Sequence, residues 1–129
     1  MSDSTTITER FRDALRSLEE SSSTDDLVDL YASGCSVGNV VDGEAFSGHD
    51  GVREFWTIYR EQFDEVSSEF AVIAGDDSGG VLEWTTTGTS NGHEVSYRGA
   101  TVLEVADGEI TRSMAYYDPA DLGRQVVES

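Results

Sequence analysis

The hydrophobic period of this chain changes once, near Val66, and this change constrains the fold more than any other feature of the sequence. Before it, apolar residues recur every three or four positions, as on the buried face of a helix. After it, apolar and polar residues alternate, as in half-buried strands. Helices first and consecutive strands afterwards are typical of an α+β domain with an antiparallel meander. We therefore expect residues 1–129 to form a single domain of this class.

The N-terminal half predicts three helices and one short strand. Thr6 and Glu9 have the spacing of a capping box, and Thr24 is expected to cap a second, short helix. A strand is expected over 35–41, and a third helix after it, beginning at Ser47, His49 or Asp50. The expected apolar faces of the three helices are Ile7, Phe11, Leu15 and Leu18; Leu27, Leu30 and Tyr31; and Val52, Phe55, Trp56, Tyr59 and Phe63.

The C-terminal half predicts four strands, over 66–74, 81–88, 94–105 and 109–117, and then a short helix over 119–126. Turn residues separate the strands at 76–80, 91–92 and 107–108. A two-residue turn at Asn91-Gly92 pairs Trp84 with Gly99 and Thr86 with Tyr97, and a three-residue loop at 106–108 pairs Gly99 with Ala115.

Because paired residues share a face, this register divides the side chains of the sheet into two sets. We expect the first set to curve around the helices and to line any cavity, and the second to be partly apolar and to face outward. The first set is Leu82, Trp84, Thr86, Tyr97, Thr101, Leu103, Ser113, Ala115 and Tyr117. The second is Glu83, Thr85, Arg98, Val102, Glu104, Ile110, Arg112, Met114 and Tyr116.

The charge of the chain excludes some partners and suggests an environment. It has 26 acidic and 8 basic residues, a net charge of −18, and every basic residue is arginine. Such a charge repels phosphates, so we expect neither nucleic acid nor an anionic membrane as a partner. Two interpretations stay open: an acidic but otherwise ordinary protein, or a protein adapted to high internal salt, where screening makes a dense acidic surface tolerable.

Other features of the sequence favour a cytoplasmic protein without a metal or cofactor. We find no basic segment followed by an apolar run at the start, and no apolar stretch long enough to span a membrane. The single cysteine, Cys35, cannot form an intrachain disulfide and is expected to be a small core thiol. His49 and His93 are too far apart to form a metal-binding motif, and Asp76-Asp77 reads as a turn.

Five short motifs stand out: 30–32 (Leu-Tyr-Ala), 48–55 from Gly48 to Phe55, 83–89 around Glu83-Trp84, 107–110 (Asp-Gly-Glu-Ile) and 116–118 (Tyr-Tyr-Asp). In their order and spacing they resemble the SnoaL-like branch of the nuclear-transport-factor-2-like superfamily over nearly the whole chain. The resemblance implies a cone-shaped, curved, antiparallel or mixed sheet wrapped around three N-terminal helices. It leaves the function open, because such relatives include isomerases, dehydratases, epoxide hydrolases, polyketide cyclases and non-catalytic binders.

The residues that such relatives use for catalysis are mostly replaced here. Asn39 stands where the resemblance places the aspartate base of ketosteroid isomerases, and Phe11 where it places their oxyanion tyrosine. The arginine and two aspartates of limonene-type epoxide hydrolases fall at Trp84, Thr86 and Ala115, none of which activates water in that way. Asp118 lies nearest to the aspartate of SnoaL-like cyclases, although it is also suited to cap a helix at Pro119.

We therefore predict a pocket for a small apolar or aromatic molecule, with no reaction assigned. An alternative is an isomerase, cyclase or hydratase/hydrolase that uses Asp118 or His49 for proton transfer; another is a non-catalytic interaction module. We also expect a homodimer that forms through the outer sheet face, because a half-apolar face on so acidic a chain should be covered. The predicted pocket residues are Asn39, Trp56, Tyr59, Trp84, Thr86, Tyr97 and Tyr117.

Overall fold

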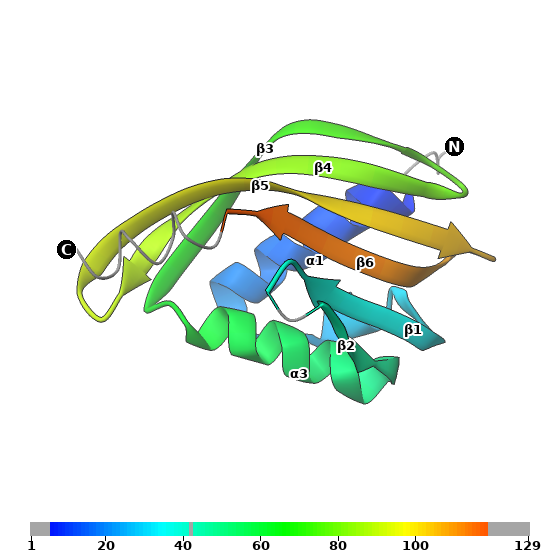
Figure 1. The fold of residues 1–129 in the computed structure, drawn as a ribbon, viewed down its shortest axis with the longest axis horizontal. Helices are drawn as coiled ribbons and strands as arrows, with labels where there is room; N and C mark the ends of the chain where they lie inside the picture. Colours follow the sequence, from blue (N-terminus) through cyan, green and yellow to red (C-terminus); the bar gives the residue numbers. More distant parts are fainter. Residues whose placement is uncertain (1–5, 42, 119–129) are drawn as a thin grey trace.

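The structure is a computed structural model that describes residues 6–41 and 43–118. A six-stranded sheet curves over the helices, and α1 and α3 lie on its concave side (Figure 1). The helices are α1 (Ile7–Ser21), α2 (Asp25–Val28) and α3 (Gly48–Glu61). The strands are β1 (Tyr31–Asn39), β2 (Gly43–Ser47), β3 (Glu65–Asp76), β4 (Gly79–Ser90), β5 (His93–Ala106) and β6 (Glu109–Tyr117).

The order of the strands in the sheet is β2-β1-β6-β5-β4-β3. The β1–β6 pair is parallel and the other pairs are antiparallel. The predicted α+β class with a curved, mixed sheet is therefore confirmed. The core fills the space between the concave face and the helices, with Phe11, Leu18, Val52 and Leu82 fully buried.

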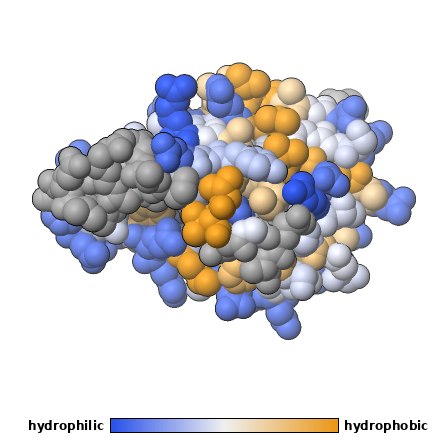
Figure 2. Space-filling view, in the orientation of Figure 1, coloured by the Kyte–Doolittle hydropathy of each residue, from blue (hydrophilic) through white to orange (hydrophobic). Residues whose placement is uncertain are grey.

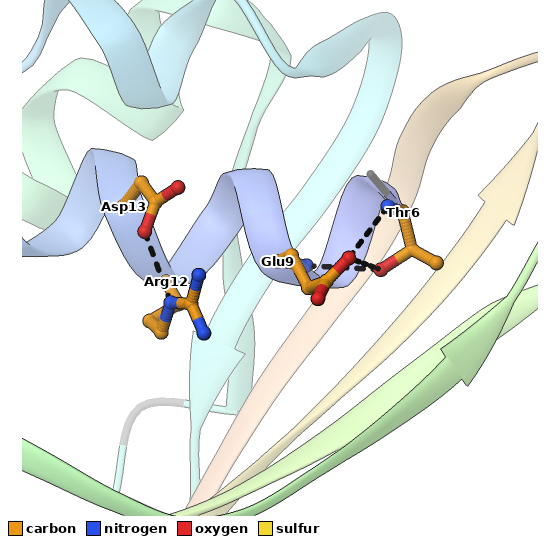
Figure 3. Close-up of polar contacts among 4 residues, drawn as sticks. All are labelled: Thr6, Glu9, Arg12 and Asp13. Atoms are coloured by element: carbon orange, nitrogen blue, oxygen red, sulfur yellow. Dashed lines mark hydrogen bonds and ion pairs between the residues drawn. The ribbon is translucent and has the colours of Figure 1, made fainter. Parts of the chain in front are cut away.

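The start of α1 follows the predicted capping box. The Thr6 side chain accepts a hydrogen bond from the Glu9 backbone N–H at 3.1 Å, and the Glu9 carboxylate accepts one from the Thr6 N–H at 3.0 Å (Figure 3). Arg12 and Asp13 form an exposed ion pair on the next turn. The apolar side of α1 then packs against β3 and β4.

The segment after α1 differs from the prediction. The helix α2 has only four residues, and Tyr31 begins β1 instead of continuing the helix. Thr24 precedes α2, but its hydroxyl accepts a hydrogen bond from Arg53 at 3.0 Å and does not cap the helix. The strand β1 therefore begins four residues before the expected strand, and β2, which was not predicted, pairs with it. Phe63 is buried but lies beyond the end of α3.

The predicted register between β4 and β5 is confirmed, because Trp84 pairs with Gly99 and Thr86 with Tyr97. The predicted pairing of Gly99 with Ala115 is wrong, since Gly99 pairs with Tyr117. Asp107 and Gly108 form a two-residue turn with positive φ at both positions, and this turn replaces the expected three-residue loop.

A bulge at Thr111 then adds one residue to β6 between the partners of Val105 and Glu104. The two changes together move the register by two residues, so most side chains keep their predicted face. Ile110 precedes the bulge and is the exception: it was expected outside but pairs with Val105 and is fully buried. The expected helix over 119–126 lies outside the described residues.

Candidate functional site

One cavity opens between the concave face of the sheet and α3. Its walls come from residues of α1, α3 and all six strands, β1 to β6. All seven side chains predicted for a pocket line it, so the structure brings them together; that a ligand binds there stays a prediction. The remaining lining residues are Leu15, Phe46, Phe55, Ile58, Gln62, Ser68 and Ala115.

The cavity is small and reaches the surface. It contains about 80 Å³ that the centre of a water-sized sphere can occupy, whereas one water needs roughly 10–15 Å³ on that measure. Ile58 and Gln62 are exposed and mark its mouth, while Thr86 and Ser68 are buried at its inner end. The space therefore suits several waters or a small organic group.

Aromatic rings form the two facing walls. On the sheet, Tyr97 packs edge-to-face on both Trp84 and Tyr117, with ring centroids 5.5 Å apart in each pair. On α3, Trp56 and Tyr59 pack edge-to-face with centroids 5.4 Å apart. Their spacing of three residues puts both rings on one side of the helix. These rings offer a ligand apolar contact on two sides of the cavity.

Trp84 is held in place from two directions. Its indole N–H donates to the Thr101 hydroxyl at 2.9 Å, and the absence of a side chain at its cross-strand partner Gly99 leaves room for the ring. A Cβ at Gly99 would lie 2.7 Å from Cη2 of Trp84, which is closer than such contacts allow. The sequence thus fixes the orientation of this ring before any ligand binds.

A buried carboxylate lies behind the inner wall of the cavity. Glu19 at the end of α1 is only 5% exposed. Its Oε2 accepts hydrogen bonds from the hydroxyls of Tyr59, at 2.9 Å, and Ser68, at 2.5 Å. Its Oε1 accepts a bond from the Ser68 backbone N–H at 3.0 Å, and the Ser68 hydroxyl is also bonded to the Thr86 hydroxyl at 2.7 Å.

Sequence reasoning did not select Glu19 or Ser68. Glu19 is the first residue of the polar segment 19–26, which follows the apolar face predicted for the first helix. A usable signal was present, however, because Glu19 comes four residues after Leu15 and eight after Phe11, on the apolar side of α1. A charged residue at a core-facing position is rarely buried without partners. Ser68 carried no comparable signal.

Burial changes the acidity of the tyrosines inside the molecule. The pKa of Tyr59 is well above its ordinary value, first because of burial and then because of the Glu19 charge. The pKa of Tyr97 is also raised, by burial first and then by Tyr117 and Glu19. Burial raises the pKa of Tyr31, which is hydrogen-bonded to Ser113, to about 12. These hydroxyls therefore stay protonated at neutral pH.

The two predicted catalytic candidates lie outside the lining of the cavity. His49 is exposed at the start of α3, and its Nε2 lies 2.7 Å from the backbone oxygen of Tyr31. Asp118 is exposed directly after β6. Asn39 does line the cavity, and its side-chain oxygen accepts a hydrogen bond from the Val41 N–H at 2.8 Å. Roles for His49 and Asp118 in proton transfer stay predictions.

No group of three or more metal-binding side chains occurs among residues 6–41 and 43–118. Asp76 accepts hydrogen bonds from the Ser78 backbone N–H and hydroxyl, which lower its pKa and close the turn between β3 and β4. Across the same described ranges, no helix is both long and apolar enough to cross a membrane.

Comparison with protein families identifies the family of the chain. The model of the SnoaL-like domain matches residues 8–113, so the chain belongs to this family. No curated protein matches it in sequence. Solved structures with low identity share its fold and include proteins named as isomerases, polyketide cyclases and epoxide hydrolases.

Three of these structures illustrate the range. A candidate polyketide cyclase from Acidithiobacillus ferrooxidans has a TM-score of 0.80 at 19% identity, over 99% of both chains. An LEH-like epoxide hydrolase of M. tuberculosis has a TM-score of 0.74 at 19% identity, over 98% of this chain and 93% of that one. A protein with a ketosteroid isomerase-like fold from Catenulispora acidiphila was solved in complex with trimethylamine. It has a TM-score of 0.77 at 16% identity, over 92% of this chain and 90% of that one.

Proposed function

We propose that this SnoaL-like domain binds a small, largely apolar or aromatic molecule in the cavity. The observation that carries the proposal is the pair of facing aromatic walls, Trp84, Tyr97 and Tyr117 on the sheet and Trp56 and Tyr59 on α3. Apolar walls with a few convergent polar groups are the usual form of a small-molecule site. A protein with the same fold has been solved in complex with trimethylamine, a small organic molecule.

Catalysis at the cavity has less support than binding. None of the described residues that line it is an aspartate, glutamate or histidine, and a proton-transfer group must reach the reacting atom directly or through one water. An enzyme that uses Asp118 or His49 would need the substrate to extend beyond this lining. A role as an interaction module would use the outer sheet face and leave the cavity without a ligand.

Intrinsic fluorescence tests the binding proposal directly. The chain has two tryptophans, Trp56 and Trp84, and both line the cavity. Titration with small alicyclic compounds, which do not absorb with tryptophan, should change the emission saturably. A variant with the cavity filled from the sheet, Ala115→Phe, should lose the response, whereas Ala106→Phe at the exposed end of β5 should retain it. The proposal fails if no compound of the panel changes the emission.

We further propose that the chain works as a homodimer in a salt-rich cytoplasm. The outer sheet face supports the dimer, because Val81 and Tyr116 are 41% and 43% exposed. Val81, Val102 and Met114 are cross-strand neighbours on this face. Apolar patches lie among hydrophilic side chains on the surface seen in Figure 2. The net charge of −18 supports adaptation to salt.

A further inference from the structure

The charge of Glu19 is buried without a cationic partner in the part of the chain that the structure describes. The side chain is bonded only to Tyr59 and Ser68, and none of the described ion pairs includes it. Burial of a carboxylate is costly unless it is paired or hydrogen-bonded. Hydrogen bonds offset this cost here, but they leave the negative charge uncompensated beside the cavity.

The hydrogen bonds around Glu19 have a fixed direction. An ionised carboxylate only accepts, so Tyr59 and Ser68 must both direct their hydroxyl hydrogens toward Glu19. Because the Ser68 hydrogen is committed in this way, the bond between Ser68 and Thr86 must be donated by Thr86. The hydroxyl hydrogens of Tyr59 and Ser68 then point to Glu19, and that of Thr86 points to Ser68. The three hydroxyl oxygens therefore present only lone pairs to the cavity.

The inner wall of the cavity is therefore a set of hydrogen-bond acceptors with a negative charge behind it. Tyr59, Ser68 and Thr86 all line the cavity. A ligand group at this wall gains most if it donates hydrogen bonds and carries positive charge.

We propose that the ligand of the cavity is a small protonated amine, whose ammonium group lies at Tyr59, Ser68 and Thr86 and whose hydrocarbon part packs on the aromatic walls. This inference rests on the proposed binding function and names its ligand class. In this proposal the negative charge of Glu19 compensates the positive charge of the ligand. An anionic or oxyanion-like group would face lone pairs at this wall, and a neutral alcohol would gain weaker hydrogen bonds.

A matched pair of probes, cyclopentylamine and cyclopentanol, separates charge from shape. Affinities are measured by tryptophan emission in molar potassium chloride, so that screening suppresses general attraction of cations to the acidic surface. We expect the amine to bind about tenfold tighter than the alcohol, because hydrogen bonds to a charged group are roughly twice as strong as neutral ones. Glu19→Gln should remove this preference. Glu20→Gln makes the same charge change at the exposed neighbour and should retain it.

Each outcome separates the inference from the function on which it rests. Equal binding of both probes, or tighter binding of the alcohol, overturns the amine and leaves the binding function standing. A preference for the amine that survives Glu19→Gln overturns the role of Glu19. Binding of neither probe overturns both proposals. If Glu19→Gln does not fold, Tyr59→Phe, which deletes one acceptor at the wall, should reduce the preference in a chain that keeps the carboxylate.

Discussion

The inner and outer faces of the sheet use alternate residues of the same strands, and neighbours on β4 show how differently the two faces are built. Leu82 on the inner face is fully buried, whereas Val81 beside it is 41% exposed. Thr86 is hydrogen-bonded to Ser68 and so joins the Glu19 network, which consists of Glu19, Tyr59, Ser68 and Thr86. Thr85 beside it pairs with Arg98 on the outer face. Packing and hydrogen bonding thus determine these inner residues, while Val81 on the outer face is left to solvent or a partner.

The largest expected effect compares these two faces at one point. Leu82→Ala should lower the free energy of unfolding by roughly 2–5 kcal/mol, because it leaves a cavity in the core. Val81→Ala should cost the single chain less than about 1 kcal/mol, since its side chain is 41% exposed there. Denaturant unfolding of both variants measures the difference. Similar costs for the two would mean that the outer face is as tightly packed as the inner one.

A second comparison uses the interior tyrosines. Tyr31 is fully buried with a pKa of about 12, against about 10 for an unfolded tyrosine. Above pH 10 the unfolded chain loses this proton while the folded chain keeps it, so stability falls as the pH rises toward 12. The loss reaches about 3 kcal/mol for two pKa units. Below pH 10 the contribution of Tyr31 is constant.

Unfolding measured between pH 9 and pH 12, roughly the range of tyrosine ionisation, checks this expectation. Tyr31→Phe should reduce the alkaline loss of stability, because it removes one of the three interior tyrosines whose pKa is raised by burial. Tyr116→Phe, at a side chain 43% exposed on the outer face, is the matched control. If Tyr31→Phe leaves the slope unchanged, the burial of its hydroxyl does not govern alkaline stability.

Salt should act mainly on the charged surface. With a net charge of −18 and no lysine, the folded chain repels itself at low ionic strength. Raising potassium chloride from the millimolar to the molar range should raise the melting temperature by about 5 °C or more, equivalent to roughly 1 kcal/mol. Thermal melts followed by circular dichroism test this. A melting temperature that barely moves would contradict adaptation to high salt.

The outer face gives the smallest expected effect on folding and a clear effect on assembly. Light scattering at molar salt should give about twice the chain mass of 14.0 kDa. Val81→Asp together with Tyr116→Asp should produce a monomer, because both side chains are exposed on the proposed interface. Met114 is a poor target, since it is only 7% exposed.

Val41→Asp is the control for this experiment, because Val41 is 59% exposed in the turn between β1 and β2, away from the outer sheet face. This variant should remain a dimer. A wild-type protein that is monomeric at micromolar concentration would contradict the proposed interface.

The sequence predicted the inner face well because a tight turn determines register. The Asn91-Gly92 turn fixed the pairing of Trp84 with Gly99, and the alternation of side chains then placed the pocket residues on one face. The two-residue turn at Asp107-Gly108 moved Ile110 to the inside. The bulge at Thr111, which was not predictable because no glycine marks it, returned the later residues of β6 to their predicted faces. The strand β2 was missed because its five residues show no clear alternation.

The candidate site was predicted in its apolar part and missed in its polar part. Aromatic residues at helical and strand spacing indicate a shared face from the sequence alone. The Glu19 network joins α1, α3, β3 and β4, and its longest-range hydrogen bond, between Glu19 and Ser68, connects residues 49 positions apart. No local pattern encodes such a contact, and only the apolar position of Glu19 on its helix hinted at it.

The central claim, that the inner face encloses a ligand site, is tested most directly by NMR of the two tryptophan indole N–H groups. Both indoles line the cavity, so their signals report on it selectively. Isotope-labelled protein is titrated with cyclopentylamine and with cyclopentanol in molar potassium chloride. The account predicts that the signals of Trp56 and Trp84 shift together and saturate with at least one probe. Indole signals that stay fixed while backbone signals of the outer face move would contradict it.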